Sequence, residues 1–153
     1  MTIYATLIYV QKDNCTLMLH RNKKENDYHR GKWNGLGGKA EAGESPEECA
    51  MRELYEESGL KAEKMQMKGF ITFPMFDGIN DWHVFLFTVS EFEGELIECN
   101  EGHLEWVPDD KLTELNLWEG DKIFIPWLFE DRFFSAKFIY ENKQYISHTV
   151  NFY

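Results

Sequence analysis

Residues Gly38–Leu60 read GKAEAGESPEECAMRELYEESGL and contain the clearest folding signals of the chain. Ser45 is a candidate N-cap, and Glu48 three positions later completes a capping box. Pro46 fits the first helical position, where its missing N–H costs nothing. Gly59 follows the last expected helical residue, as a C-terminal capping glycine should. These signals predict a helix that begins at Ser45 and ends just before Gly59.

This helix carries an acidic face. At about 100° per residue, Glu53, Glu56 and Glu57 fall within one third of its circumference. Like charges so placed repel one another, and most acidic runs are simply solvated surfaces. The alternative is a cation site, because Mg²⁺ and Mn²⁺ prefer hard oxygen ligands. Arg52, on the same helix, could orient one carboxylate through a bidentate pair.

The loop before the helix favours the cation site. Asn34–Lys39 reads NGLGGK, and glycines of this kind let main-chain groups approach a ligand closely. A backbone carbonyl of the loop could therefore complete a metal coordination shell. The loop matches neither the Walker pattern nor the dinucleotide-binding fingerprint, so it is not expected to cradle phosphates as those loops do.

Together these residues resemble a known family. Gly38, five residues, Glu44, seven residues and then Arg52–Leu60 (RELYEESGL) match the Nudix box. Seven fixed and two apolar positions agree, so that an accidental match in a chain of this length is on the order of 1 in 10 million. The expected order of elements also resembles the family's α/β/α sandwich. The resemblance implies an α/β (α+β) fold with a mixed β-sheet, in a single domain spanning residues 1–153.

The resemblance also implies a chemistry. Nudix enzymes cleave a nucleoside diphosphate linked to another moiety, and the implied cofactor is Mg²⁺, with Mn²⁺ as an alternative. The implied catalytic and metal-binding groups are the carboxylates of Glu53, Glu56, Glu57 and Glu101, with the carbonyl of Gly38 as a further metal ligand. Glu101 lies outside the box, so a surface role stays open, and Glu98 and Glu105 compete with it. Which glutamate is the general base also stays open, because coupled carboxylates share their titration. The box residues expected to be structural are Glu44, Arg52 and Gly59.

Two segments resemble one branch of the family. Trp33–Lys39 and Leu117–Asp121 are similar to segments of the diphosphatases that remove oxidised purine nucleoside triphosphates such as 8-oxo-dGTP. Trp118 could stack on a purine, and Asn34 and Asp121 could read its Watson–Crick edge. The expected substrate-binding residues are Thr6, Asn34, Phe73, Trp118 and Asp121. For Trp118 and Phe73, an ordinary core position is the alternative.

The sequence departs from this branch at one position. The branch can carry paired acids in the pocket segment, whereas Gly120 precedes Asp121 here. The preference for oxidised or ordinary purines therefore stays open.

The composition of the chain limits the classes of molecule that it is expected to bind. With 16 basic and 27 acidic residues among 153, the net charge of −11 argues against a broad grip on duplex nucleic acid or on an anionic membrane. A chain this acidic needs bridging cations to hold a polyphosphate. No apolar run approaches the ~20 residues that span a bilayer, and the N-terminus does not resemble a signal peptide. Cys15, Cys49 and Cys99 match neither a disulfide framework nor a zinc site, which indicates the cytoplasm. The oligomeric state is left open.

The rest of the chain is rich in strand signals. Strands are expected at Ile3–Val10, Thr16–His20, Phe70–Met75, Trp82–Ser90, His103–Val107, Phe133–Tyr140 and Gln144–Phe152. Short helices are expected at Asp109–Leu115 and from Pro126 towards Asp131, and Arg21–Lys32 is expected to be a loop. In the helix of the box, Ala50, Met51 and Leu54 are expected to face the core.

Two other functions remain open. Within the same family, the substrate could be ADP-ribose, a nucleotide sugar, a dinucleoside polyphosphate or an RNA 5′ end. From a different class, the chain could be a nucleotide-sensing module that has lost turnover. Such a module should have lost some of its metal ligands, whereas all three helix glutamates are present.

Overall fold

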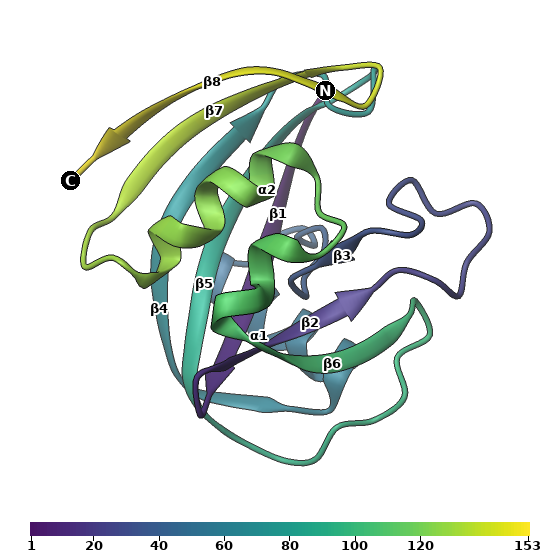
Figure 1. Ribbon diagram of the computed structural model, residues 1–153, viewed down its shortest axis with the longest axis vertical. Helices are drawn as coiled ribbons and strands as arrows, with labels where there is room; N and C mark the ends of the chain where they lie inside the picture. The colour runs from purple at the N-terminus through teal and green to yellow at the C-terminus, as the bar shows by residue number, and fades with distance from the viewer.

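A mixed β-sheet organises the chain in the computed structural model, which describes residues 1–153 (Figure 1). Its strands are β1 (Thr2–Lys12), β2 (Cys15–His20), β3 (Trp33–Asn34), β4 (Lys61–Phe73), β5 (Asp81–Glu93), β6 (His103–Pro108), β7 (Phe134–Glu141) and β8 (Gln144–Phe152). The α-helices are α1 (Pro46–Ser58) and α2 (Glu119–Phe124), and the 3-10 helices are η1 (Asp109–Glu114) and η2 (Ile125–Phe129). No helix is both long enough and apolar enough to cross a bilayer.

The strand order is β3-β2-β1-β5-β4-β7-β8, and β6 pairs with β2. β1 runs parallel to β5 and β4 runs parallel to β7, whereas the pairs β4–β5 and β7–β8 are antiparallel. β1 and β2 form an antiparallel hairpin, but the two strands pair only at its tip, at Gln11↔Thr16 and Lys12↔Cys15. Beyond the tip, β2 diverges from β1 to pair with β3 and β6 (Figure 1).

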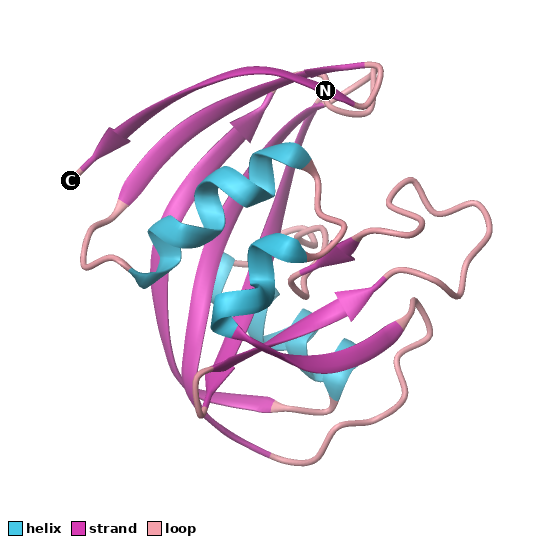
Figure 2. Ribbon diagram, viewed as in Figure 1, coloured by secondary structure: helices cyan, strands magenta, loops and turns pink.

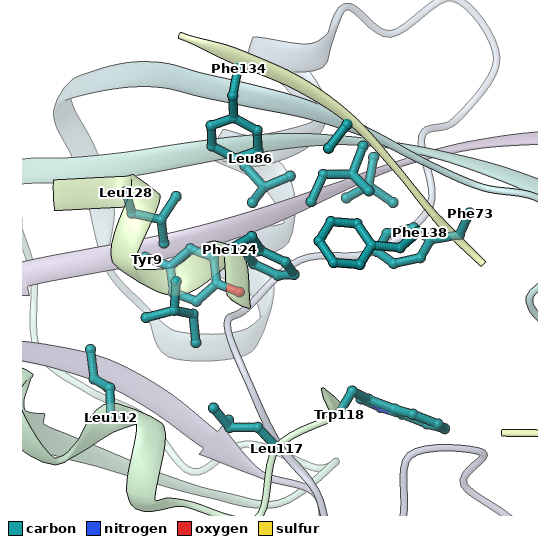
Figure 3. Close-up of a cluster of buried hydrophobic side chains, with 14 of the residues drawn as sticks. Tyr9, Phe73, Leu86, Leu112, Leu117, Trp118, Phe124, Leu128, Phe134 and Phe138 are labelled. Carbon is teal, nitrogen blue, oxygen red and sulfur yellow. The ribbon is translucent and has the colours of Figure 1, made fainter. Parts of the chain in front are cut away.

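Helices cover both faces of the sheet, which confirms the predicted α/β/α sandwich (Figure 2). Alternation along β1 places Ile8 with the buried Ala50 and Leu54 of α1, whereas Tyr9 packs in the other cluster with Phe124 of α2. Figure 3 shows the cluster that contains Tyr9 and Phe124. The rings of Tyr9, Phe124 and Phe138 lie close together in it, and Trp118 lies apart from them. The core is therefore two apolar layers, one on each side of the sheet.

The local signals around α1 are confirmed. The Ser45 hydroxyl accepts a bond from the Glu48 N–H at 3.1 Å, and the Glu48 carboxylate accepts one from the Ser45 N–H at 2.9 Å. Gly59 adopts a left-handed φ of 79°, and its N–H donates to the Tyr55 carbonyl. The expectation for Met51 was wrong, because this side chain lies beyond the buried arc and is 44% exposed.

Three other expectations differ from the structure. β4 begins at Lys61, well before the expected strand. The sequence did not reveal this early start, because β-bulges between Ala62 and Gly69 interrupt the alternation of residues along the strand. The helix α2 was not expected, since its six residues include Gly120 and it has no side-chain cap. The helix expected from Pro126 is the short 3-10 helix η2.

Candidate functional site

The glycine loop lies between β1 and α1. The Thr6 N–H donates to the Gly38 carbonyl at 2.9 Å, so the loop pairs with the part of β1 that β2 has left. Gly37 has a φ of +143°, and a Cβ there would lie 2.0 Å from the Thr6 carbonyl oxygen. A Cβ at Gly38 would lie 2.6 Å from Oε1 of Glu53. Glycine is needed at position 37, where a Cβ would overlap the backbone of β1, whereas a Cβ at position 38 would displace the Glu53 carboxylate.

Arg52 connects this loop to the acidic face of α1. Its Nε and Nη2 donate to the two carboxylate oxygens of Glu44, at 2.7 and 2.9 Å. Its Nη1 lies 3.0 Å from Glu53 and 3.2 Å from Glu56, and Nη2 also donates to the Lys39 carbonyl. The guanidinium lowers the pKa of Glu44 to about 2. Arg52 therefore holds the loop and two helix carboxylates in one network.

Burial has raised the pKa values of two carboxyl groups on α1. Glu57 is buried and accepts a bond from the Gly37 N–H at 2.7 Å. Its pKa is raised to about 9, first by burial and then by the neighbouring Glu101 carboxyl. Burial also raises the pKa of Glu53, although Arg52 opposes the shift. Negative charge is disfavoured at this point of the molecule, which is the condition that a bound cation relieves.

The donor set suits a divalent cation, but the side chains are not gathered around one point. The available groups are carboxylate and carbonyl oxygens, which Mg²⁺ and Mn²⁺ prefer. No three acidic, histidine or cysteine side chains are arranged to hold an ion. Glu53 and Glu56 instead turn towards Arg52. Cation binding therefore needs these two side chains to rotate away from the guanidinium.

A cavity of about 490 Å³ adjoins the helix, where β1 and β2 diverge. All five predicted substrate-binding residues line it: Thr6, Asn34, Phe73, Trp118 and Asp121. The predicted metal-site residues Gly38, Glu53 and Glu101 also line it, whereas Glu56 and Glu57 do not. Glu98 and Glu105, the competitors of Glu101, lie outside the lining. The cavity thus has an aromatic end, which contains Phe73 and Trp118, and an acidic end, which contains Glu53 and Glu101.

Two buried polar groups lie at the aromatic end. Oδ1 of Asn34 is buried with no hydrogen-bond partner. Asp121 is 6% exposed, and burial raises its pKa to about 8 against the opposing charge of Lys32. A polar group left unsatisfied in this way costs about 1–3 kcal/mol, which a ligand that hydrogen-bonds there would offset. Trp118 and Phe73 belong to the core cluster and also line the cavity, so their placement is compatible with both alternatives, a core position and a substrate contact.

Several residues of the cavity were not predicted. They include Arg21, His29, Lys39, Phe76, Trp82 and Tyr140. His29 and Phe76 come from connecting segments without periodic patterning, so no local signal marked them. Tyr140 occupies a strand position whose buried neighbours predict only core. Trp118 has the Phe76 ring at 5.1 Å and the Tyr140 ring at 5.7 Å, both edge-on.

Comparisons with known proteins agree with this arrangement. A model of the NUDIX domain family matches residues 1–128. The chain is 31% identical over 141 residues to the oxidized purine nucleoside triphosphate hydrolase of Danio rerio, covering 92% of this chain and 88% of the relative. The protein of the same name from Mus musculus is 28% identical over 144 residues, covering 94% and 90% of the two chains.

A solved structure is similar over nearly the whole length. The mutator MutT protein of Bacillus halodurans superposes with a TM-score of 0.88 at 32% identity, and the match covers 97% of each chain. The family match spans the Gly38–Leu60 box, the glycine loop and most of the cavity. The chain therefore belongs to the NUDIX domain family.

Proposed function

We propose that the protein is a divalent-cation-dependent hydrolase of purine nucleoside triphosphates, oxidised purines such as 8-oxo-dGTP included, which releases a monophosphate and pyrophosphate. The single observation that carries the proposal is the cavity, whose aromatic end holds the unsatisfied Oδ1 of Asn34 and whose other end reaches Glu53 on the acidic face of α1. A nucleotide has the same polarity, with a flat base at one end and phosphates at the other.

The aromatic end suits a purine. Trp118 offers an indole face for stacking. The Asn34 side chain carries a donor and an acceptor on one amide. Asp121, with its pKa raised to about 8, holds a proton at neutral pH and can donate as well as accept. These two groups complement the alternating donors and acceptors of a purine edge, and hydrogen bonds discriminate between bases better than apolar contacts do.

The other end suits a polyphosphate with its cations. We assign Mg²⁺, or Mn²⁺, to the carboxylates of Glu53, Glu56, Glu57 and Glu101 and to the Gly38 carbonyl. A cation bound there supplies Lewis-acid polarisation of the phosphates and lowers the pKa of an attacking water. The residues of this chain do the positioning: Arg52 holds Glu44 and the Lys39 carbonyl beside the helix, and the Gly37 N–H fixes Glu57. Arg21 and Lys39 line the cavity and offset phosphate charge.

The names of two relatives, and their sequence identity to this chain, support the same substrate class. Two relatives are named as hydrolases of oxidised purine nucleoside triphosphates, and the chain spans 88% and 90% of their lengths. We infer that this chain shares their activity.

The test is a panel of nucleotides assayed for pyrophosphate release with Mg²⁺. We expect release from 8-oxo-dGTP and dGTP and none after chelation of the cation. The panel includes ADP-ribose, a nucleotide sugar and a dinucleoside polyphosphate. Cleavage of one of these alone would replace the proposed substrate, and tight binding without cleavage of any of them would make the chain a sensing module.

A further inference from the structure

Gly120 and Tyr140 share one small space at the aromatic end of the cavity. The Gly120 N–H donates to Oη of Tyr140 at 2.6 Å. A Cβ at position 120 would lie 2.7 Å from this oxygen and 2.9 Å from Cδ1 of Phe138. The phenol therefore excludes any side chain at position 120. The pocket segment thus has no acid at position 120, and the hydroxyl of Tyr140, a residue of β7, lies there instead.

The hydroxyl of Tyr140 retains a proton to donate. Its oxygen accepts from Gly120, and it forms no second hydrogen bond within the chain. Tyr140 is 5% exposed, and burial raises its pKa, so that the proton stays in place throughout the neutral range. A buried donor without an acceptor is costly, and water or a ligand normally satisfies it.

A hydrogen-bond acceptor for the Tyr140 hydroxyl can approach from the cavity, because aromatic rings lie on the other sides. Aromatic rings surround Tyr140, with the ring centroids of Phe76 at 5.1 Å and Trp118 at 5.7 Å. Tyr140 lines the same cavity as Asn34 and Asp121. A base stacked against Trp118 would therefore meet three hydrogen-bonding groups, and the phenol offers it a donor that no acceptor of the chain engages.

We propose that Tyr140 is a specificity-determining residue, whose hydroxyl donates to an exocyclic oxygen of the purine in the place that an acid at position 120 would otherwise occupy. The inference rests on the proposed function and deepens it by naming the substrate class as oxopurines. A phenol held by the Gly120 N–H presents its proton, so it favours a carbonyl at the base edge over an amino group.

The test compares Tyr140→Phe with the wild type on 8-oxo-dGTP, dGTP and dATP. Loss of one hydrogen bond between neutral groups corresponds to roughly a tenfold change at most. We expect kcat/KM to fall about fivefold to tenfold for the oxopurines and to stay within about twofold for dATP. A loss confined to 8-oxo-dGTP would assign the acceptor to O8, and an equal loss with dGTP would assign it to O6. Equal losses for all three nucleotides would overturn the inference, since a merely structural role lowers every activity alike.

A matched control and a second variant keep the test independent of folding. Tyr145→Phe removes a neighbouring phenol whose oxygen is bonded to Nδ1 of His148 at 2.6 Å and which does not line the cavity. Its ratio of oxopurine to dATP activity should equal that of the wild type. Gly120→Ala retains the phenol but displaces it, and should lower the same ratio as Tyr140→Phe does. An unchanged ratio in Gly120→Ala would contradict the proposed contact.

Binding of a nucleoside monophosphate separates this inference from the proposed function. 8-oxo-dGMP has no anhydride to cleave, so its affinity without a cation reports base recognition alone. If the wild type hydrolyses no triphosphate yet binds 8-oxo-dGMP more tightly than Tyr140→Phe, the proposed hydrolysis fails while the role of Tyr140 stands. If the wild type is active but both proteins bind 8-oxo-dGMP equally, the role of Tyr140 fails alone.

Discussion

The indole Nε1–H of Trp118 donates a hydrogen bond to Nδ1 of His29 across 2.9 Å. The two rings meet edge to face, with their centroids 5.6 Å apart. Burial, helped by the charge of Arg21, lowers the pKa of His29 to about 4, so the ring is neutral at pH 7 and its Nδ1 is an acceptor. A residue of the Arg21–Lys32 loop thus fixes the plane of the tryptophan on which the base is proposed to stack.

Replacing His29 should therefore weaken nucleotide binding more than turnover. His29→Phe keeps an aromatic ring against Phe76 and removes the acceptor for Trp118. We expect KM for a purine triphosphate to rise roughly threefold to tenfold, with kcat nearly unchanged, because the lost bond acts on ground state and transition state alike. Steady-state kinetics measures both constants. A fall in kcat at constant KM would show that His29 acts elsewhere.

The same histidine predicts a dependence of stability on pH. Its folded pKa of about 4 lies below the ordinary value of 6.5, so the folded state binds fewer protons than the unfolded state between these values. Stability from this group is complete above about pH 6.5 and is lost as the pH falls towards 4, on the order of 3 kcal/mol in total. The free energy of unfolding in urea, measured from pH 7 to pH 4, should fall more steeply for the wild type than for His29→Phe. Parallel curves would contradict the burial of a neutral His29.

Asp121 predicts the opposite trend. Its pKa is raised from 3.8 to about 8, so its stability contribution is complete below about pH 4 and is lost as the pH rises to about 8. Asp121→Asn removes this loss without changing shape. We expect the variant to exceed the wild type in stability by a few kcal/mol at pH 9, on the scale of about 1.4 kcal/mol per pKa unit, and the excess to shrink towards pH 5. Thermal unfolding without nucleotide checks this, and a constant difference across pH would contradict it.

Much of the site could be predicted because its signals are local. The cap residues of α1, the glycine loop and the carboxylates of the box are all specified within one short segment. The aromatic end is different, since it is assembled from β1, a loop, α2 and β7. Nothing near His29 or Tyr140 in the sequence shows that these side chains meet Trp118 and Gly120. Such contacts follow from tertiary packing, which local patterns do not encode.

The fold shows the same division. The strand β7, whose burial alternates regularly, and the strand β5, which contains four consecutive buried residues, were predicted close to their bounds. In β4, bulges shift the register near Ala62 and Gly69 and remove the period that marks a strand. The helix α2 is too short for a pattern to emerge, and its place depends on the bond from Gly120 to Tyr140.

A substitution of Glu57 should lower catalytic activity without lowering stability. The carboxyl is buried with a pKa of about 9, so Glu57→Gln removes a group that is costly to ionise and keeps an acceptor for the Gly37 N–H. We expect turnover to fall at least about 100-fold, in the range seen for loss of a key transition-state contact, while the melting temperature stays equal or rises. Glu47→Gln, on the exposed first turn of the same helix, is the matched control and should keep full activity. Full activity in Glu57→Gln would count against the assignment.

The proposed activity requires that the carboxylates of α1 bind a cation beside the cavity, and anomalous diffraction from crystals soaked in Mn²⁺ with a nucleotide can locate that cation. We predict an anomalous peak between Glu53, Glu57 and the Gly38 carbonyl, with Glu53 turned away from Arg52. Soaked crystals in which Glu53 keeps its bond to Arg52 and no peak lies against α1, from a protein that hydrolyses the nucleotide in solution, would contradict the account.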